Sequence, residues 1–347
     1  MHPKRLLNLA PSLTNDHLHS LPLLVLYLTD GCNSRCTMCD IWRNPRRNMP
    51  LALVESIVDA CAELDVSHVL LSGGEAMQHP QWPQIAARFR DAGVHVMLLT
   101  NGLYLRKQAD DVINNVDEVI VSLDGGTPQT YEAIRGVDAF DLVLDGIRAV
   151  RAAGLPVTTR STIQHLNYHE MPQMIDAALA ADVTTISFLA VDVANDLAFG
   201  ERDLGLVADA QSPALRRADI EPLAAVLDDI EARYADCFAS GRIAESPTKL
   251  RRTLLDYFGA LHGLREFAAP RCNAPQFSTV IGVDGTLQPC YFLPTYGRLQ
   301  PHGAALPDAI NWDAARQLRQ AYRRGERPEC ARCVCPLYKS PRNLMSM

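Results

Sequence analysis

The sequence lacks a long apolar run near its start. Residues 1–21 contain polar and charged breaks such as Asp16-His17, and the longest apolar run there is too short to span a bilayer. We therefore expect a cytoplasmic protein with no signal peptide and no membrane association. An excess of basic residues is also missing. The formal net charge of −7 gives no general electrostatic reason to bind nucleic acid, so none is expected as a partner.

Several catalytic signatures are absent as well. We find no Ser-His-Asp signature, no Walker loop and no dinucleotide fingerprint, which argues against the enzyme classes built on them. Ten histidines are scattered without the spacing of metal ligands. There is no internal repeat and no low-complexity tract.

Cysteine, in contrast, is plentiful. Ten cysteines in a chain without an export signal indicate reduced thiols and metal binding rather than disulfides. The 347 residues, 48% of them hydrophobic and 21% charged, are enough for one large barrel-like domain and a smaller one.

Three of the cysteines form a compact loop motif. Cys32, Cys36 and Cys39 are spaced C-x3-C-x2-C and follow the apolar run Leu23–Leu28, which is typical of a buried strand. Three thiolates would hold a four-iron cluster and leave one iron open for chemistry. The alternative is zinc, but a closed zinc site needs a fourth ligand, and no Cys or His follows within a few residues.

Strand-like and helix-like segments alternate after this loop. Helices are expected at Glu55–Leu64, where Cys61 would lie in the core, and at Phe140–Ala153, with Gly154 as its C-cap. Six strands with intervening helices predict right-handed βαβ units and a parallel sheet. The expected strands after the first are His68–Leu71, His95–Thr100, Glu118–Leu123, Val157–Thr162 and Thr184–Ala190.

The alternation stops between about Ala194 and Ala269. Apolar residues at steps of three and four predict an amphipathic helix from Ile220 to Tyr234 and a second one from Leu250 to Leu261. This segment is interpreted as a helical bridge, on which Cys237 has a structural role.

The last section contains a second group of cysteines. Cys272 and Cys290 flank a predicted hairpin with Asp284-Gly285 at its turn. A helix at Trp312–Arg323 leads to Cys330 and Cys333, spaced C-x2-C. These four thiols would form a site for zinc or for an iron–sulfur cluster. Cys335 is a candidate spare thiol, alternative ligand, or proton or hydrogen donor to a substrate radical, which makes it the candidate catalytic residue.

These motifs resemble those of a known family. The first motif is similar to the C-x3-C-x-aromatic-C signature of radical S-adenosylmethionine (SAM) enzymes, with Met38 at the aromatic position. Gly73-Gly74-Glu75 resembles the GGE motif of that family, although Ala76 replaces the usual proline. Gly285, Cys290 and the C-x2-C pair resemble the twitch extension, the short relative of the SPASM domain.

The resemblance implies an α/β fold: a partial (β/α)6 TIM-like barrel, a helical bridge and a small C-terminal β-hairpin and knuckle domain that binds metal. The expected divisions are an N-terminal segment (1–20), a radical SAM barrel (21–193), the bridge (194–269) and a twitch/SPASM-like domain (270–347).

It also implies an enzyme of oxidoreductase or transferase type. One [4Fe-4S] cluster on Cys32, Cys36 and Cys39 would cleave SAM to a 5′-deoxyadenosyl radical, and one auxiliary [4Fe-4S] cluster would assist. Its four ligands would be Cys272, Cys290, Cys330 and Cys333. The expected SAM-binding residues are Met38, Gly73, Gly74, Glu75, Ser122, Asp124 and Arg160.

Some of these assignments have simpler readings. Asp124 would otherwise cap a turn, Arg160 would be a surface residue, and Asn101, a weaker candidate, would belong to an Asn-Gly turn. The expected partners are a small-molecule or peptide substrate and a reducing protein such as flavodoxin or ferredoxin. Two other functions use the same cysteines: a zinc-binding scaffold, and a two-cluster redox carrier without SAM chemistry.

Overall fold

The computed structural model describes residues 11–12, 15–195, 198–199 and 212–345. At its centre is one nine-stranded sheet with the order β6-β5-β4-β3-β2-β1-β7-β8-β9. The outermost strands, β6 and β9, do not pair with each other, so the sheet is open. The strands are β1 (Leu23–Thr29), β2 (His68–Gly73), β3 (His95–Thr100), β4 (Glu118–Ser122), β5 (Val157–Ile163), β6 (Thr185–Ala190), β7 (Ser278–Ile281), β8 (Thr286–Gln288) and β9 (Gly297–Arg298).

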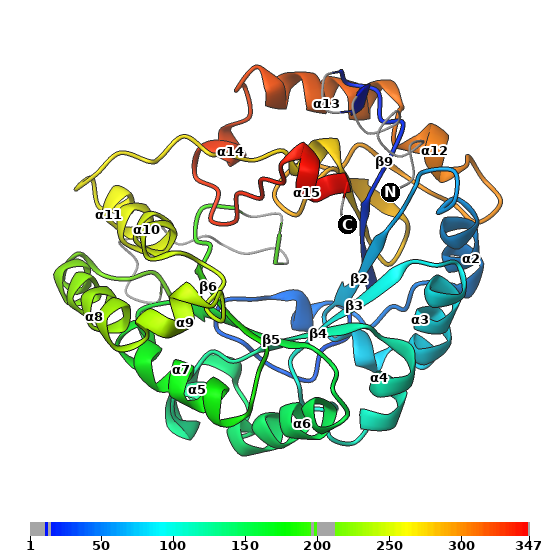
Figure 1. Ribbon diagram of the computed structural model, residues 1–347. Helices are drawn as coiled ribbons and strands as arrows, with labels where there is room; N and C mark the ends of the chain where they lie inside the picture. The colour runs from blue at the N-terminus through cyan, green and yellow to red at the C-terminus, as the bar shows by residue number, and fades with distance from the viewer. Residues whose placement is uncertain (1–10, 13–14, 196–197, 200–211, 346–347) are drawn as a thin grey trace.

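Strands β1 to β6 pair in parallel, each with its neighbour in the sequence. Parallel strands require crossover connections, and helices supply them. Figure 1 shows these helices forming an outer arc around the curved sheet. They are α2 (Leu51–Asp59), α3 (Trp82–Asp91), α4 (Ala109–Asn115), α5 (Pro128–Arg135), α6 (Phe140–Ala152) and α7 (Met171–Ala180). The predicted α/β partial barrel is confirmed.

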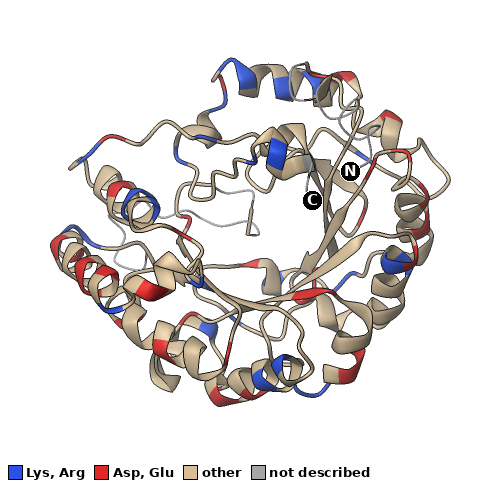
Figure 2. Cartoon of the chain, in the orientation of Figure 1, with Lys and Arg blue, Asp and Glu red and all other residues tan. Residues whose placement is uncertain are grey.

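The sheet is the buried layer of this barrel. In β1, Leu24, Leu26 and Leu28 are fully buried, as expected for a strand covered on its faces. Charged residues of both signs lie mainly on the outer helices (Figure 2). Burial of apolar strand and helix faces therefore fixes the barrel and leaves the strand ends free for polar residues.

The predicted segments lie close to the observed ones. The strand His95–Thr100 has the predicted bounds, and the helix predicted at Phe140–Ala153 ends one residue earlier, with Gly154 at φ +83° after it. The helix predicted at Glu55–Leu64 instead spans Leu51–Asp59, because the chain turns helical directly after Pro50. Cys61 lies beyond this helix and is 2% exposed, so its predicted place in the core is confirmed.

The segment predicted as a bridge is largely helical between residues 217 and 261. It contains α8 (Ile220–Arg233), α9 (Ala235–Ala239), α10 (Pro247–Leu250) and α11 (Tyr257–Leu261). The second predicted helix is interrupted by a π-helical segment, Arg251–Asp256. Parts of the predicted bridge (196–197 and 200–211) and of the predicted N-terminal segment (1–10 and 13–14) lie outside the described residues.

The C-terminal hairpin extends the sheet of the barrel. Strand β7 pairs in parallel with β1, and β8 pairs with β7 in antiparallel. Gly285 at the predicted turn has φ +83°, and a Cβ there would lie 2.2 Å from the carbonyl oxygen of Leu299. The hairpin that carries Cys290 is thus attached directly to the strand that precedes the first cysteine loop. The chain continues through α12 (Leu306–Ala309), α13 (Asp313–Arg323), α14 (Pro328–Ala331) and α15 (Pro341–Met345).

Among the described helices, none has the combination of length and apolar composition that a membrane crossing needs.

Candidate active site

The first cysteine loop leaves β1 at the carboxyl edge of the parallel strands. On one side, the backbone N–H groups of Gly74 and Glu75 donate to the carbonyls of Thr29 (2.7 Å) and Gly31 (2.8 Å). On the other side, the N–H of Arg35 donates to the carbonyl of Arg135 at 3.0 Å. Backbone contacts from β2 and α5 therefore hold the loop before any ligand is considered.

The glycines of the Gly-Gly-Glu segment make this approach possible. Gly73 has φ +132°, and a Cβ on it would lie 2.4 Å from the carbonyl oxygen of Thr29. A Cβ on Gly74 would lie 2.4 Å from that of Gly31. Only glycine fits at both positions. The observed role of the pair is to bring β2 against the cysteine loop, and its contact with a cofactor stays a prediction.

The three thiols of the loop are close enough to influence one another. Burial raises the pKa of Cys32 to about 11 and that of Cys39 to about 12, and the neighbouring Cys36 adds to both rises. Burial also raises the pKa of Cys36. Burial thus favours the neutral thiols, and a bound metal centre would favour the thiolates, because metal ligation takes the deprotonated sulfur. The donor set, three half-buried thiols in one loop, fits such a centre.

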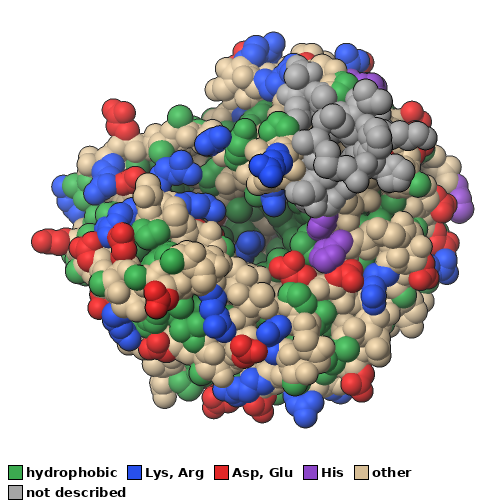
Figure 3. All heavy atoms as spheres, in the orientation of Figure 1, with side chains coloured by type: hydrophobic (Ala, Val, Ile, Leu, Met, Phe, Trp, Pro, Cys, Tyr) green, Lys and Arg blue, Asp and Glu red, His purple; other side chains and the backbone are tan. Residues whose placement is uncertain are grey.

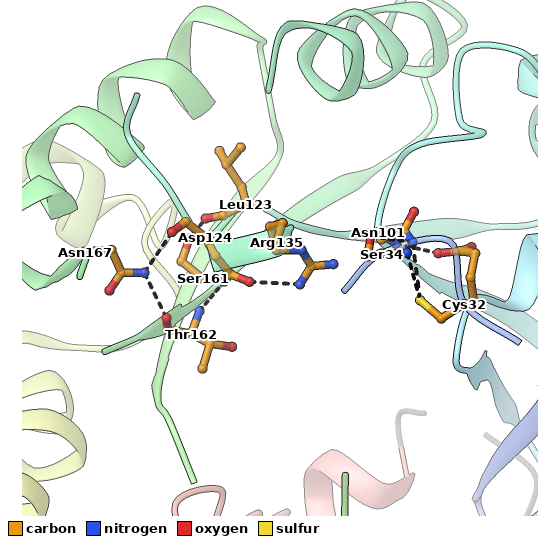
Figure 4. A network of polar contacts seen from close by, with 10 residues as sticks. Cys32, Ser34, Asn101, Leu123, Asp124, Arg135, Ser161, Thr162 and Asn167 are labelled. Atoms are coloured by element: carbon orange, nitrogen blue, oxygen red, sulfur yellow. Dashed lines mark hydrogen bonds and ion pairs between the residues drawn. The ribbon is translucent and has the colours of Figure 1, made fainter. Parts of the chain in front are cut away.

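N–H donors surround Cys32. The backbone N–H of Ser34 lies 3.5 Å from its sulfur, and Nδ2 of Asn101 lies 3.8 Å away. The same Nδ2 donates to Oδ1 of Asn33 at 2.8 Å and to Oγ of Ser34 at 3.1 Å (Figure 4). Donors of this kind stabilise thiolate ligands and tune iron–sulfur centres. Asn101, a weak candidate by its Asn-Gly turn, is therefore part of the site.

Glu75 has a positioning role in the structure. Its carboxylate is 1% exposed and accepts from the Thr100 hydroxyl (2.8 Å), the Asn101 backbone N–H (2.7 Å) and the Met77 backbone N–H (3.1 Å). Burial raises the pKa of this carboxyl, and the hydrogen bonds oppose the rise. Glu75 thus connects the end of β2 to the end of β3 and places Asn101. Its predicted contact with SAM stays a prediction.

Replacing Glu75 by alanine is expected to lower the free energy of unfolding by roughly 2–4 kcal/mol, because two backbone N–H groups and one hydroxyl lose their acceptor in a buried place. The midpoint of urea unfolding measures the effect. Glu55→Ala is the matched control, since Glu55 is half exposed and 3.6 Å from Arg88, and it should change stability by at most about 0.5 kcal/mol. Equal midpoints for the two variants would contradict this role of Glu75.

The other predicted cofactor residues lie at neighbouring strand ends. Ser122 is the half-buried last residue of β4 and pairs in register with Arg160 on β5. Nε of Arg160 is buried and has no hydrogen-bond partner among the described residues. Asp124 is 1% exposed, and its two carboxylate oxygens accept from Arg135 and from the Thr162 backbone N–H. Met38 is half-buried and packs against the core.

The second cysteine group surrounds the hairpin and the knuckle at α14. Burial raises the pKa of Cys290 to about 12 and that of Cys330 to about 11, and in each case the thiol of Cys272 adds to the rise. Burial also raises the pKa of Cys333, with Cys335 as the next cause. The four predicted ligands therefore lie near one another, with the exposed thiol of Cys335 beside them.

Among the residues that the structure describes, no three His, Cys, Asp or Glu side chains are placed to hold one metal ion.

Two tyrosines lie between the groups. Cys39 is close enough to Tyr27 on β1 to raise the pKa of its hydroxyl, and Tyr291 directly follows Cys290. The ring centres of the two tyrosines are 6.0 Å apart. Burial raises the pKa of both. This ring contact thus brings β1, which precedes the first cysteine loop, beside the chain that follows Cys290. Figure 3 shows a hollow on this face, lined largely by hydrophobic side chains.

A cleft of about 410 Å³ lies next to the second group, between the chain after β6 and the knuckle. Asp192, Asn195, Phe292, Arg332 and Cys333 are among the residues that line it. A volume of this size is typical of small-molecule sites. The cleft is a candidate place for substrate beside the second cysteine group.

The parallel strands β1 to β6 form an open α/β partial barrel, and the three-thiol loop lies at the carboxyl edge of these strands. Residues 26–178 match the family model of the radical SAM superfamily, so this part of the chain is similar to that superfamily.

Two curated relatives and one solved structure illustrate the similarity. The AdoMet-dependent heme synthase of Methanosarcina barkeri is 30% identical over 162 residues, which are 45% of this chain and 46% of that protein. The PqqA peptide cyclase of Streptomyces rochei is 32% identical over 164 residues, 45% of this chain and 44% of that protein. The chain thus spans about half the length of the curated relatives it matches.

SuiB of Streptococcus suis, in a crystal structure with bound S-adenosylmethionine, is similar over nearly the whole chain. The TM-score is 0.65 at 15% identity, and the match covers 96% of this chain and 78% of SuiB. A second structure of SuiB contains its precursor peptide SuiA. At this identity the likeness shows the fold alone.

Proposed function

We propose that the protein is a radical SAM enzyme that abstracts a hydrogen atom from its substrate. The observation that carries the proposal is the loop of Cys32, Cys36 and Cys39 at the carboxyl edge of the sheet, held by backbone contacts with Gly74, Glu75 and Arg135. When bound, the [4Fe-4S] cluster supplies the electron that cleaves SAM, and the 5′-deoxyadenosyl radical so formed takes the hydrogen atom.

The residues of this chain supply placement. The backbone of the Gly73-Gly74-Glu75 segment lies beside the thiols and would bind the SAM amino group. Arg160 would pair with the SAM carboxylate through its unpartnered Nε, a charge-assisted contact. Ser122 would bind the ribose or the methionine part. Asp124 would contact the ribose only by giving up one of its present hydrogen bonds, so its main role is to hold Arg135.

An auxiliary [4Fe-4S] cluster on Cys272, Cys290, Cys330 and Cys333 completes the proposal. The mutual proximity of these thiols supports it, as does the cleft beside Cys333. An auxiliary cluster suits a reaction in which an electron leaves a substrate radical or in which substrate is ligated. The substrate would be a peptide or a small molecule; the similarity to the PqqA peptide cyclase and to SuiB, which has been crystallised with its precursor peptide, favours a peptide. A flavodoxin or ferredoxin would supply electrons.

The test uses anaerobically reconstituted protein. We expect about eight irons per chain, the sum of two four-iron clusters, and 5′-deoxyadenosine on addition of dithionite and SAM, detected by mass spectrometry. Bound zinc without 5′-deoxyadenosine would instead support a zinc scaffold. Iron without SAM binding in calorimetry would support a two-cluster redox carrier. Either result would overturn the proposal.

A further inference from the structure

Arg135 is a buried cation at the first cysteine group to which the proposed reaction assigns no role. It is the last residue of α5 and is 7% exposed. Its Nη1 donates to Oδ2 of Asp124 at 2.9 Å. Its Nε is buried and has no hydrogen-bond partner among the described residues. The buried hydroxyl of Tyr131 lies beside the guanidinium as a further hydrogen-bonding neighbour: burial raises the pKa of this hydroxyl, and its contact with Arg135 opposes the rise.

The backbone fixes Cys36 against this end of α5. The residues on either side of Cys36 are both bound to the helix end. The N–H of Arg35 donates to the carbonyl of Arg135 at 3.0 Å, and the N–H of Thr37 donates to the carbonyl of Ile134 at 2.9 Å. Gly136 follows at φ +68°, and a Cβ there would lie 2.6 Å from the carbonyl oxygen of Arg35. The helix end and the cysteine loop are therefore in direct backbone contact.

The direction of the Arg135 side chain is also fixed. Asp124, its ion-pair partner, accepts from the Thr162 N–H at 2.6 Å, and Asn167 donates to the backbone carbonyls of both Asp124 (2.9 Å) and Thr162 (3.0 Å). Figure 4 shows the guanidinium extending from this network toward the loop that carries Cys32. A rigid network behind the arginine thus points its charge at the thiols.

Arg135 and Asp124 form a buried ion pair, with side chains 8% and 1% exposed. Buried ion pairs are weak stabilisers of folding, since desolvation offsets their attraction. A function at the thiols is the better reason for a buried cation here.

We propose that Arg135 is a positioning residue that directs a fixed positive charge and an N–H donor toward the cluster on Cys32, Cys36 and Cys39, and that it raises the reduction potential of this cluster. The inference rests on the proposed function. A positive charge in a poorly solvated place favours the more negative, reduced cluster, and hydrogen bonds to sulfur act in the same direction. Asp124 partly neutralises the charge and therefore acts in the opposite direction.

The test is a redox titration of the reconstituted full chain followed by electron paramagnetic resonance. The signal of the first cluster is the one that Cys36→Ala removes. Arg135→Gln keeps polar donors but removes the charge. We expect the ratio of reduced to oxidised cluster at a fixed potential to fall about tenfold, which corresponds to a reduction potential lower by about 59 mV for one electron. Arg135→Lys should stay near the parental potential. Asp124→Asn should raise the potential.

The reduction potential should fall in Arg135→Gln and rise in Asp124→Asn, and these opposite directions distinguish an effect of charge from a structural role. A residue that only holds the loop would, when changed, lower the iron content or shift the potential in the same direction as its partner. If Arg135→Gln does not fold, Arg135→Lys and Asp124→Asn still decide, and an unchanged or lowered potential in Asp124→Asn would overturn the inference. A parental chain that binds no first cluster would instead overturn the proposed function itself.

Discussion

Cys36→Ala is expected to abolish formation of 5′-deoxyadenosine while leaving the iron of the second cysteine group in place. Cys36 is the middle of the three thiols, and two thiolates cannot replace the three that would hold the first cluster with one iron open. The loop should keep its shape, because Arg35 and Thr37 bind the end of α5 through their backbones. Mass spectrometry of the dithionite and SAM reaction, with iron counted in the same sample, measures the effect.

The matched control is Cys237→Ala. Cys237 is also a half-buried cysteine, but it lies on α9, outside both cysteine groups. This variant should keep all of its iron and form 5′-deoxyadenosine at the parental rate. If Cys36→Ala still cleaves SAM as fast as Cys237→Ala does, the assignment of the first motif is wrong.

The fold could largely be predicted from the sequence, because the apolar pattern that marks a buried strand spans only a few neighbouring residues. Apolar runs such as Leu23–Leu28 and His95–Thr100 carry that pattern within a few residues, and Gly154 marks a helix end by its backbone conformation. The pairing of β7 with β1 could not be predicted from such a local pattern, because it joins segments about 250 residues apart. The residues of either strand do not indicate which strand it pairs with.

The site was predictable where covalent spacing carries the chemistry. The candidate ligands Cys32, Cys36 and Cys39 can be picked out by their spacing, whereas the groups that lie beside them come from other strands and helices. Arg135 ends α5, and the only local signal for it is the Arg-Gly pair at a helix end, which usually marks nothing more than a C-cap. Asn101 resembles an ordinary turn until the fold brings β3 beside the loop.

The second cysteine group gives the other large effect. Cys333→Ala is expected to lower the iron content from about eight to about four per chain, since one auxiliary cluster would lose a ligand in a group already crowded with thiols. Formation of 5′-deoxyadenosine should continue, because the first cysteine loop is held by β2 and α5 and not by the knuckle. The chain should then cleave SAM without completing the reaction on its substrate.

Cys335 decides how this result is interpreted. Its exposed thiol lies close enough to Cys333 and Cys272 to raise the pKa of both, so it is a ready replacement ligand. If Cys335 takes over in Cys333→Ala, the single variant keeps its iron and only the double variant Cys333→Ala/Cys335→Ala falls to about four. If Cys335 is instead a donor to a substrate radical, Cys335→Ala alone keeps about eight irons and loses product. Full iron in the double variant would contradict an auxiliary cluster at this group, because two of its five thiols would then be dispensable together.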